Sequence, residues 1–234
     1  MSRLDPSLIR HLPIFQSLDD DALRSILAEA SPRRLPKGTA MFEHDAKASE
    51  FFLVLDGRLK VVKITPHGEQ VLIRFVIPGE ICGMAVAIGK TTYPATAFAA
   101  TESLALAWPS AQWPKLCEKA PALAANAMQA FGERLQEAHS RIAELSTEEV
   151  QRRVAHALLR LAGQAGTKVE NGFLIDFPVT RQDLAEMTGT TLHTVSRIMS
   201  VWETSGLIEG GRQRLLLRDP HKLLVAAEGR SSGT

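Results

Sequence analysis

The sequence predicts an α+β protein in three parts: an N-terminal β-roll of jelly-roll or cupin-like type, one long helix, and a small C-terminal domain of helices and a β-hairpin. Three observations predict it: short apolar runs between turn residues up to Trp108, heptad spacing of apolar residues after Pro121, and two helical patterns around a glycine after Thr180. We place the parts at 1–118, 119–147 and 148–234. The chain of 234 residues exceeds the usual single domain, which agrees with this division.

The first part opens with one short helix and continues as strands. Between Leu18 and Ala30 an acidic run precedes apolar residues at helical spacing. From Gly38 to Trp108 the apolar runs are short and alternate with turn signals that contain glycine. The runs are FFLVL, RLKVVKIT, QVLIRFVI and SLALAW. Several short strands at this spacing are typical of a sandwich or jelly-roll barrel.

The long helix carries a narrow apolar stripe at alternating steps of four and three residues, which are a and d positions of heptads. Its members are Ala124, Met128, Phe131, Leu135, Ala138, Ile142 and Leu145. Such a seam favours a second long helix as partner, and a parallel homodimer supplies one. The alternative is a helix folded onto its own domain, because small residues such as Ala124 and Ala138 also suit close packing within one chain.

After a further helical run at 148–163, a helix-turn-helix is predicted from Thr180 onward. Thr180 can cap a helix that begins at Arg181, and Gly189 stands where a tight turn needs positive φ. Ala185 is small enough for two helices to cross closely. Two aliphatic residues, Val195 and Ile198, are expected to face inward from the second helix.

The second helix has side chains suited to reading base edges in duplex DNA. It begins near Thr191 and is expected to present Leu192, His193, Ser196 and Arg197 outward. An arginine here can donate two hydrogen bonds to guanine O6 and N7. The following segment, GLIEGGRQRLLLRD, predicts a wing turned at Gly210-Gly211, with Arg212 and Arg214 available for phosphates. The alternative is an ordinary pair of helices and a hairpin in a small α/β domain.

Composition excludes several other classes. The net charge of +1 neither supports nor excludes DNA, and no stretch approaches the roughly 18 apolar residues that span a bilayer, so we expect a cytoplasmic protein with no membrane partner. Two cysteines, Cys82 and Cys117, are too few for an iron–sulfur cluster and are expected to be small buried hydrophobic residues. The segment GMAVAIGKT has five residues between its glycines where a phosphate-binding loop requires four. The sequence also has no His-Glu-x-x-His motif for a catalytic zinc, so no enzyme is predicted.

The whole chain resembles the CRP/FNR family of bacterial transcription factors, most closely in TRQDLAEMTGTTLHTVSR and GLIEGGRQRLLL. The resemblance implies a β-roll sensor, a dimer helix, a winged helix-turn-helix and recruitment of RNA polymerase. Family members that bind cyclic AMP follow a Gly-Glu with an Arg-Ser or Arg-Thr pair. This chain has Gly79-Glu80 but no arginine in 92–96, so we expect no cyclic AMP. The family's oxygen sensors use N-terminal cysteines, which are absent before Cys82, so no iron–sulfur cluster is expected.

The recognition helix resembles that of the nitric-oxide-responsive NnrR and DNR groups, because it has His193 three residues before Ser196-Arg197. This resemblance implies activation of denitrification-type genes at TTG-N8-CAA-like palindromes, with nitric oxide detected through haem. His11 stands where the haem ligand of such regulators is expected. Cys82 lies near where a haem-based carbon monoxide sensor of the family has a thiolate, although the register is off by one residue. The alternatives are a regulator that needs no effector and one that senses another small ligand.

Overall fold

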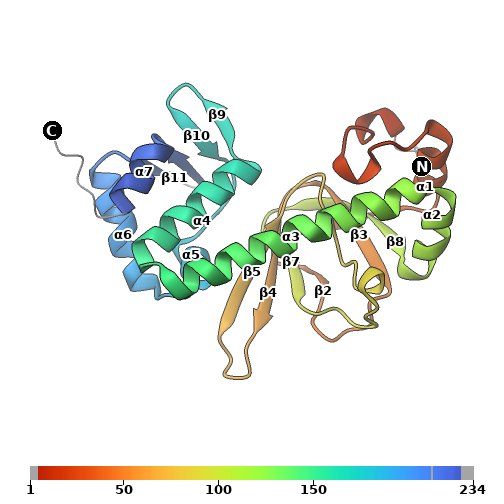
Figure 1. Ribbon diagram of the computed structural model, residues 1–234, viewed down its shortest axis with the longest axis horizontal. Coiled ribbons are helices and arrows are strands. Elements are labelled where there is room, and N and C mark those ends of the chain that lie inside the picture. The colour runs from red at the N-terminus through yellow and green to blue at the C-terminus, as the bar shows by residue number, and fades with distance from the viewer. Residues whose placement is uncertain (1–4, 212, 228–234) are drawn as a thin grey trace. The chain divides into compact units, whose positions relative to one another are not determined.

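The computed structural model describes residues 5–211 and 213–227 of the chain. They form two compact units, one containing 73–138 and the chain before residue 64, the other containing 64–72 and the chain from 139 onward. Figure 1 shows strands gathered in the first unit and mostly helices in the second. None of the helices in the described part of the chain has the length and hydropathy needed to cross a membrane. The predicted fold class is confirmed.

The first unit begins with helical segments and then becomes a β-roll. The short helices are η1 Pro6–Leu8, η2 Pro13–Phe15, α1 Asp20–Ala28, η3 Val86–Ile88, η4 Ser110–Gln112 and α2 Trp113–Lys119. The strands are β1 Ser31–Leu35, β2 Ala40–Phe42, β3 Glu50–Asp56, β4 Leu59–Ile64, β5 Gln70–Val76, β6 Ile81–Cys82, β7 Thr96–Ala99 and β8 Ser103–Pro109. The four predicted strand runs thus lie in β3, β4, β5 and β8, and the predicted first helix is α1. Helix α3 (Pro121–Thr147) follows.

Two four-stranded sheets form the roll, in the orders β1-β8-β3-β6 and β2-β7-β4-β5. Strands β3 and β8 pair antiparallel, with Phe52 opposite Ala107 and Leu53 opposite Leu106. Successive side chains of a strand point to opposite faces, so a strand buried on both sides reads as a continuous apolar run. This explains why FFLVL and SLALAW do not alternate with polar residues.

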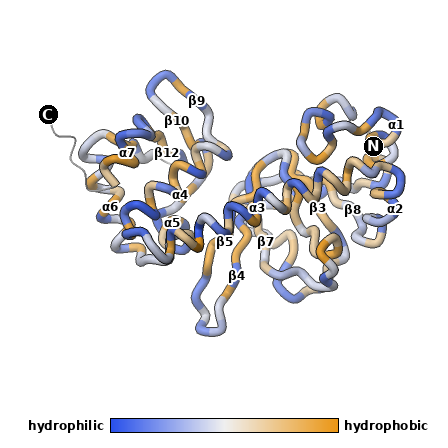
Figure 2. Tube along the Cα trace, viewed as in Figure 1, coloured by the Kyte–Doolittle hydropathy of each residue, from blue (hydrophilic) through white to orange (hydrophobic). Residues whose placement is uncertain are grey.

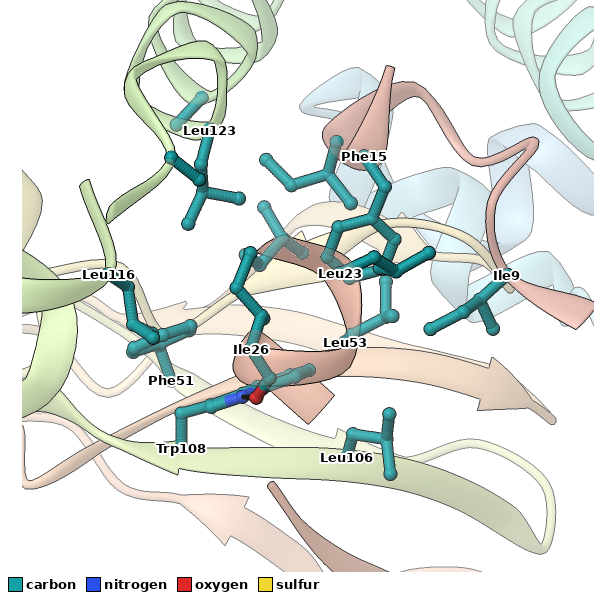
Figure 3. Packing of buried hydrophobic residues seen from close by; sticks show 14 of the residues in the cluster. Ile9, Phe15, Leu23, Ile26, Phe51, Leu53, Leu106, Trp108, Leu116 and Leu123 are labelled. Carbon is teal, nitrogen blue, oxygen red and sulfur yellow. Dashed lines mark hydrogen bonds between the residues drawn. The ribbon is translucent and has the colours of Figure 1, made fainter. Parts of the chain in front are cut away.

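The outer face of β3 and β8 packs against helices (Figure 3). Leu53 and Trp108 lie there beneath Leu23 and Ile26 of α1, and the indole Nε1 of Trp108 donates to the Ile26 carbonyl oxygen at 2.8 Å. Leu123 of α3 belongs to the same cluster. Sequestering these side chains from water contributes roughly 1.5–3 kcal/mol each, which fixes α1 and the start of α3 on the sheet.

The inner face forms a second cluster between the two sheets. Aromatic rings stack there: the centroids of Phe42 and Tyr93 lie 4.2 Å apart, and those of Phe42 and Phe52 lie 5.9 Å apart. Four buried alanines of β7 and β8 line the same interior, namely Ala97, Ala99, Ala105 and Ala107. Their small side chains leave room for the large rings, as close packing requires.

The second unit consists of helices and one sheet. Its elements are the end of α3, α4 Val150–Ala165, β9 Thr167–Val169, β10 Gly172–Ile175, α5 Arg181–Thr188, α6 Leu192–Thr204, β11 Ile208–Gly211, β12 Arg214–Leu217 and α7 Pro220–Ala227. The sheet has the order β11-β12-β10-β9. Trp202 of α6 and Leu158 of α4 are among its fully buried side chains.

Four sequence expectations need correction. Helix α4 runs through Gly163 to Ala165, because a glycine at an exposed helical position costs only about 1 kcal/mol. The segment between α4 and Thr180, for which no element is predicted, contains the hairpin β9–β10. The wing turns after Gly211, since both glycines lie in β11 and Gln213 has φ of 66°. Cys82 is buried as expected, but Cys117 is only partly buried.

Candidate nucleic-acid interface and roll interior

The turn between α5 and α6 is built as its sequence predicts. Thr180 and Asp183 form a capping box, in which each side chain accepts a hydrogen bond from the other residue's backbone N–H. Gly189 ends α5 with φ of 61°, the left-handed conformation that glycine adopts without strain. Ala185 and Val195 are both buried where the helices cross. These local features shape the turn that joins α5 to α6.

Helix α6 exposes one continuous stripe of side chains. Thr191 is its N-cap, and the expected outward residues Leu192, His193 and Arg197 are exposed, while Ser196 is partly buried. Arg197 makes no hydrogen bond or ion pair within the described residues, so its guanidinium is free to donate. The opposite face, with Ile198 and Trp202, is buried as its spacing predicts.

The wing lies next to α6 in the chain and adds a second exposed cation. Strands β11 and β12 pair with Gly210 opposite Leu215 and Gly211 opposite Arg214. Arg214 is exposed, and its side chain lies along Gly211, where a Cβ atom would be 2.9 Å from Arg214 Cγ. The other wing residue expected to contact phosphate, Arg212, lies outside the described residues.

The predicted stripe of α3 is open to solvent in the single chain. Exposure reaches 70% for Met128, 56% for Leu135 and 61% for Ile142. The tube of α3 in Figure 2 shows the corresponding alternation of hydrophobic and hydrophilic residues. Phe131 differs, because it is partly buried against the cluster on the outer face of the roll. The remaining members Ala124, Ala138 and Leu145 are exposed. The stripe therefore lies on a different face from Leu123 and Ala127, which pack on the roll.

Inside the roll, Tyr93 occupies the segment 92–96, which contains no arginine. Its ring is buried against Phe42, and its hydroxyl donates to the Glu50 carbonyl oxygen at 2.7 Å and accepts from the Glu50 N–H at 3.2 Å. Burial raises the pKa of this phenol, so it stays neutral. Tyr93 thus supplies a neutral, satisfied ring where a cyclic phosphate would need a cation. Nothing in the sequence alone signalled this role.

A charged cluster lies between the roll and α3. Arg74 donates to Glu80 Oε2 at 2.6 Å, and Arg134 of α3 donates to the Ile81 carbonyl oxygen at 2.6 Å. Desolvation, followed by repulsion from Arg74, lowers the pKa of Arg134 to about 10. Burial also raises the pKa of the Cys82 thiol to about 12. Cys82 is therefore a protonated thiol enclosed in the inner cluster of the roll.

The candidate haem ligand His11 lies between η1 and η2 and is exposed. Its imidazole is accessible to an iron, although Ile9 and Ile14 of the same segment are buried in the roll's outer cluster. Asn126 of α3 holds this segment by donating to the carbonyl oxygens of Ile14 and Gln16. Among residues 5–211 and 213–227, no group of three His, Cys, Asp or Glu side chains could hold a metal ion.

The ion pair that joins α5 to α6 was not predicted from the sequence. Arg181, the first residue of α5, donates to the carboxylate of Glu203 near the end of α6, at 3.1 Å and 3.4 Å. The two residues are 22 positions apart. No periodicity joins positions at such a separation, so the pair becomes visible only in the folded domain.

Comparison with known proteins assigns both halves of the chain. Residues 32–120 match the cyclic nucleotide-binding domain, and residues 152–225 match the Crp-like helix-turn-helix domain. The chain is 25% identical to the transcriptional activator protein Anr of Pseudomonas aeruginosa, covering 95% of this chain and 90% of Anr. It is 26% identical to the cyclic AMP receptor protein of Thermus thermophilus, covering 93% and 97%. The structure of FixK2 from Bradyrhizobium japonicum superposes with a TM-score of 0.74 at 20% identity, covering 88% and 98%.

Proposed function

Since the chain is a DNA-binding transcription regulator of the CRP/FNR family, we propose that it acts as a homodimer in which two copies of α6 read the half-sites of a palindrome. The observation that carries this proposal is Arg197, which is exposed on the outward stripe of α6 next to Ser196 and has no partner among residues 5–211 and 213–227. The relatives named above are regulators rather than enzymes, and the chain is not an enzyme.

The chemistry of the stripe indicates which bases it reads. Arg197 can donate two hydrogen bonds to guanine, and the methyl groups of Leu192 can contact thymine methyls. These two residues suit the TTG half of a TTG-N8-CAA palindrome. His193 can donate or accept a hydrogen bond, so it sets the base at the following position. Thr180, Thr191 and Arg214 are the proposed donors to phosphate, which orient the helix without reading sequence.

The test of DNA reading is binding of the full chain to a labelled TTG-N8-CAA duplex and to a scrambled duplex of equal length. Arg197→Ala should lower affinity for the palindrome about 10- to 100-fold, because a bidentate guanine contact is worth roughly 1–3 kcal/mol. Arg24→Ala, which removes an exposed arginine of α1, is the matched control and should bind as the parent does. Equal affinities of Arg197→Ala and the parent would contradict the proposal.

We further propose that the two copies meet along the α3 stripe and that the bound dimer recruits RNA polymerase. The first proposal is supported by exposed Met128, Leu135 and Ile142, apolar side chains at heptad positions that a second helix would cover. Two half-sites lie about 34 Å apart, so only a dimer of fixed geometry places both α6 helices in successive major grooves.

For the effector, we propose nitric oxide, and no cyclic AMP. The neutral Tyr93, already hydrogen-bonded to Glu50, argues against a cyclic phosphate in the roll. His193 beside Ser196-Arg197 supports the resemblance to the nitric-oxide-responsive groups, and accessible His11 is the residue that would hold a haem. When bound, haem supplies the iron that takes nitric oxide. An effector-independent regulator remains the alternative candidate.

Haem titration of the purified chain decides between these candidates. A Soret band that shifts on adding nitric oxide, and that His11→Ala removes while His67→Ala keeps, supports the haem proposal. The same titration without a Soret shift would favour effector-independent control. Calorimetry with cyclic AMP is expected to show no heat of binding.

A further inference from the structure

Glu203 lies where three parts of the nucleic-acid interface meet. It belongs to the last turn of α6, it accepts from Arg181 at the first position of α5, and it lies against Gly210 in the wing. Both contacts from Arg181 come from one nitrogen, Nη2. The side chains of Arg181 and Glu203 are 39% and 33% exposed, so the pair sits at the surface.

The contact with the wing explains why residue 210 is a glycine. Gly210 has neither positive φ nor a place in the turn. A Cβ atom built there would lie 2.7 Å from Oε1 of Glu203, closer than a Cβ and an oxygen approach in real structures. Any larger residue must therefore displace the carboxylate. Because that oxygen belongs to the end of a flexible side chain, the displacement is possible, and it moves a carboxylate that accepts from Arg181 through both oxygens.

The donors left on Arg181 indicate what the pairing achieves. A guanidinium has five N–H donors in a rigid fork, and only those on Nη2 are engaged by Glu203. The donors on Nε and Nη1 make no hydrogen bond within residues 5–211 and 213–227. They are fixed at the N-terminus of α5, where backbone N–H groups and the helix dipole also favour an anion.

We propose that Glu203 is a positioning residue of the DNA interface: it holds Arg181 in place to donate to a backbone phosphate, and its carboxylate packs against Gly210 of the wing. The proposal rests on the proposed function and names a part of it that sequence reasoning did not find. A carboxylate at a DNA-binding surface should by itself repel phosphates. The proposal predicts the opposite, that removing this carboxylate weakens binding.

The experiment measures the affinity of the full chain for the TTG-N8-CAA duplex over a range of salt concentrations. Each phosphate bound by a cationic side chain contributes about 0.9 to the slope of log affinity against log salt, so releasing one phosphate in each half-site lowers the slope by about 1.8. We expect Arg181→Ala and Glu203→Ala each to show this reduction and to weaken binding on the order of 10-fold. The double variant should weaken binding no more than either single one.

Gly210 supplies an independent arm of the test. Gly210→Ala should weaken binding in the parent but have no effect in the Glu203→Ala background, where no carboxylate remains to be displaced. Glu203→Gln keeps the shape of the side chain and one hydrogen-bond acceptor. It should therefore retain most of the slope of log affinity against log salt concentration. The matched control is Glu50→Ala, which unpairs Arg33 at a similarly exposed site in the first unit and should leave the slope unchanged.

Several results would overturn the proposal. They are tighter binding by Glu203→Ala with an unchanged slope, additive effects of Arg181→Ala and Glu203→Ala, and equal effects of Gly210→Ala in both backgrounds. If Arg197→Ala abolishes preference for the palindrome while Glu203→Ala does not alter the slope, this inference fails and the proposed function stands. A parent chain with no preference for the palindrome overturns both.

Discussion

At the scale of single residues, burial in the roll decides the chemistry of Cys82. Its thiol lies in the inner cluster, with Met41 Sδ at 3.9 Å from its sulfur. Desolvation raises its pKa to about 12, and the positive charges of Arg74 and Arg134 oppose this without reversing it. The thiolate, the nucleophilic form, is therefore scarce at neutral pH.

We predict that Cys82 couples the stability of the first unit to alkaline pH. The thiol ionises near pH 9 when unfolded and near pH 12 when folded, so between these values the unfolded state binds fewer protons. The free energy of unfolding should fall as pH rises above about 9, by at most about 1.4 kcal/mol per pH unit. Denaturant titrations from pH 7 to 11 measure this. Cys82→Ala should lose this part of the pH dependence, and identical curves for the two proteins would contradict the prediction.

The structural roles of some residues could be predicted from the sequence, whereas those of others could not. Gly189 was predictable, because positive φ in a tight turn is a local requirement that points to glycine. Gly210 was misassigned to a turn. The space for a side chain at this position is limited by Glu203, which belongs to another element. Tyr93 shows the same limit: the absence of an arginine is visible in sequence, whereas the stacking on Phe42 that takes its place is a tertiary contact.

At the scale of elements, α3 shows which face of a long helix meets the roll. Leu123 and Ala127, four residues apart, are buried, and the heptad stripe lies on another face. Heptad spacing alone left open whether the helix folds onto its own domain or meets a second copy. In the structure one face of α3 packs on the roll while most of the stripe stays exposed, with Phe131 partly buried between them. The two alternatives therefore concern different faces and do not exclude each other.

We predict that a charge at Leu135 disrupts the dimer. Leu135→Glu places a carboxylate at the centre of the proposed seam, where burial without a partner is costly. Sedimentation should show a monomer at micromolar concentration, with helical circular dichroism close to that of the parent. The control Gln136→Glu adds the same charge at the neighbouring exposed position and should remain dimeric. A Leu135→Glu dimer as tight as the parent would refute the seam.

The capping box gives a prediction for α5. Thr180→Ala removes the side-chain acceptor for the Asp183 N–H and should lower the free energy of unfolding by about 1 kcal/mol, the usual value of a helix N-cap. Thermal or denaturant unfolding of the full chain measures it. Thr180→Ser retains a hydroxyl acceptor and should stay close to the parent. A loss equal for both variants would show that the cap is not the cause.

At the scale of the whole molecule, the last turns of α3 group with the second unit. Glu144 pairs with Arg160 of α4, Arg141 donates to the Met187 carbonyl oxygen at 3.2 Å, and Leu145 lies 3.2 Å from the position of a Cβ at Gly189. The sequence division at 147 followed the end of the helix. The sequence pattern could not reveal the contacts of Arg141, Glu144 and Leu145, because each contact joins residues of different elements.

We predict that a C-terminal fragment needs this part of α3. A fragment of residues 139–227 should unfold at a higher temperature than one of residues 148–227, because only the former keeps the contacts of Arg141, Glu144 and Leu145. Circular dichroism melts of the two fragments measure the difference. Glu144→Gln in the longer fragment should remove part of it, and equal melting temperatures for the two fragments would contradict the prediction.

The placement of the three tryptophans gives the molecule a built-in spectroscopic reporter. Trp108 and Trp113 belong to the first unit, where Phe51 contacts both rings, whereas Trp202 is fully buried in the second unit. A chain with Trp108→Phe and Trp113→Phe would therefore emit only from beneath the recognition helix. Its fluorescence lifetime would record events in the DNA-binding half while an effector is added, without a dye attached to the surface that meets DNA.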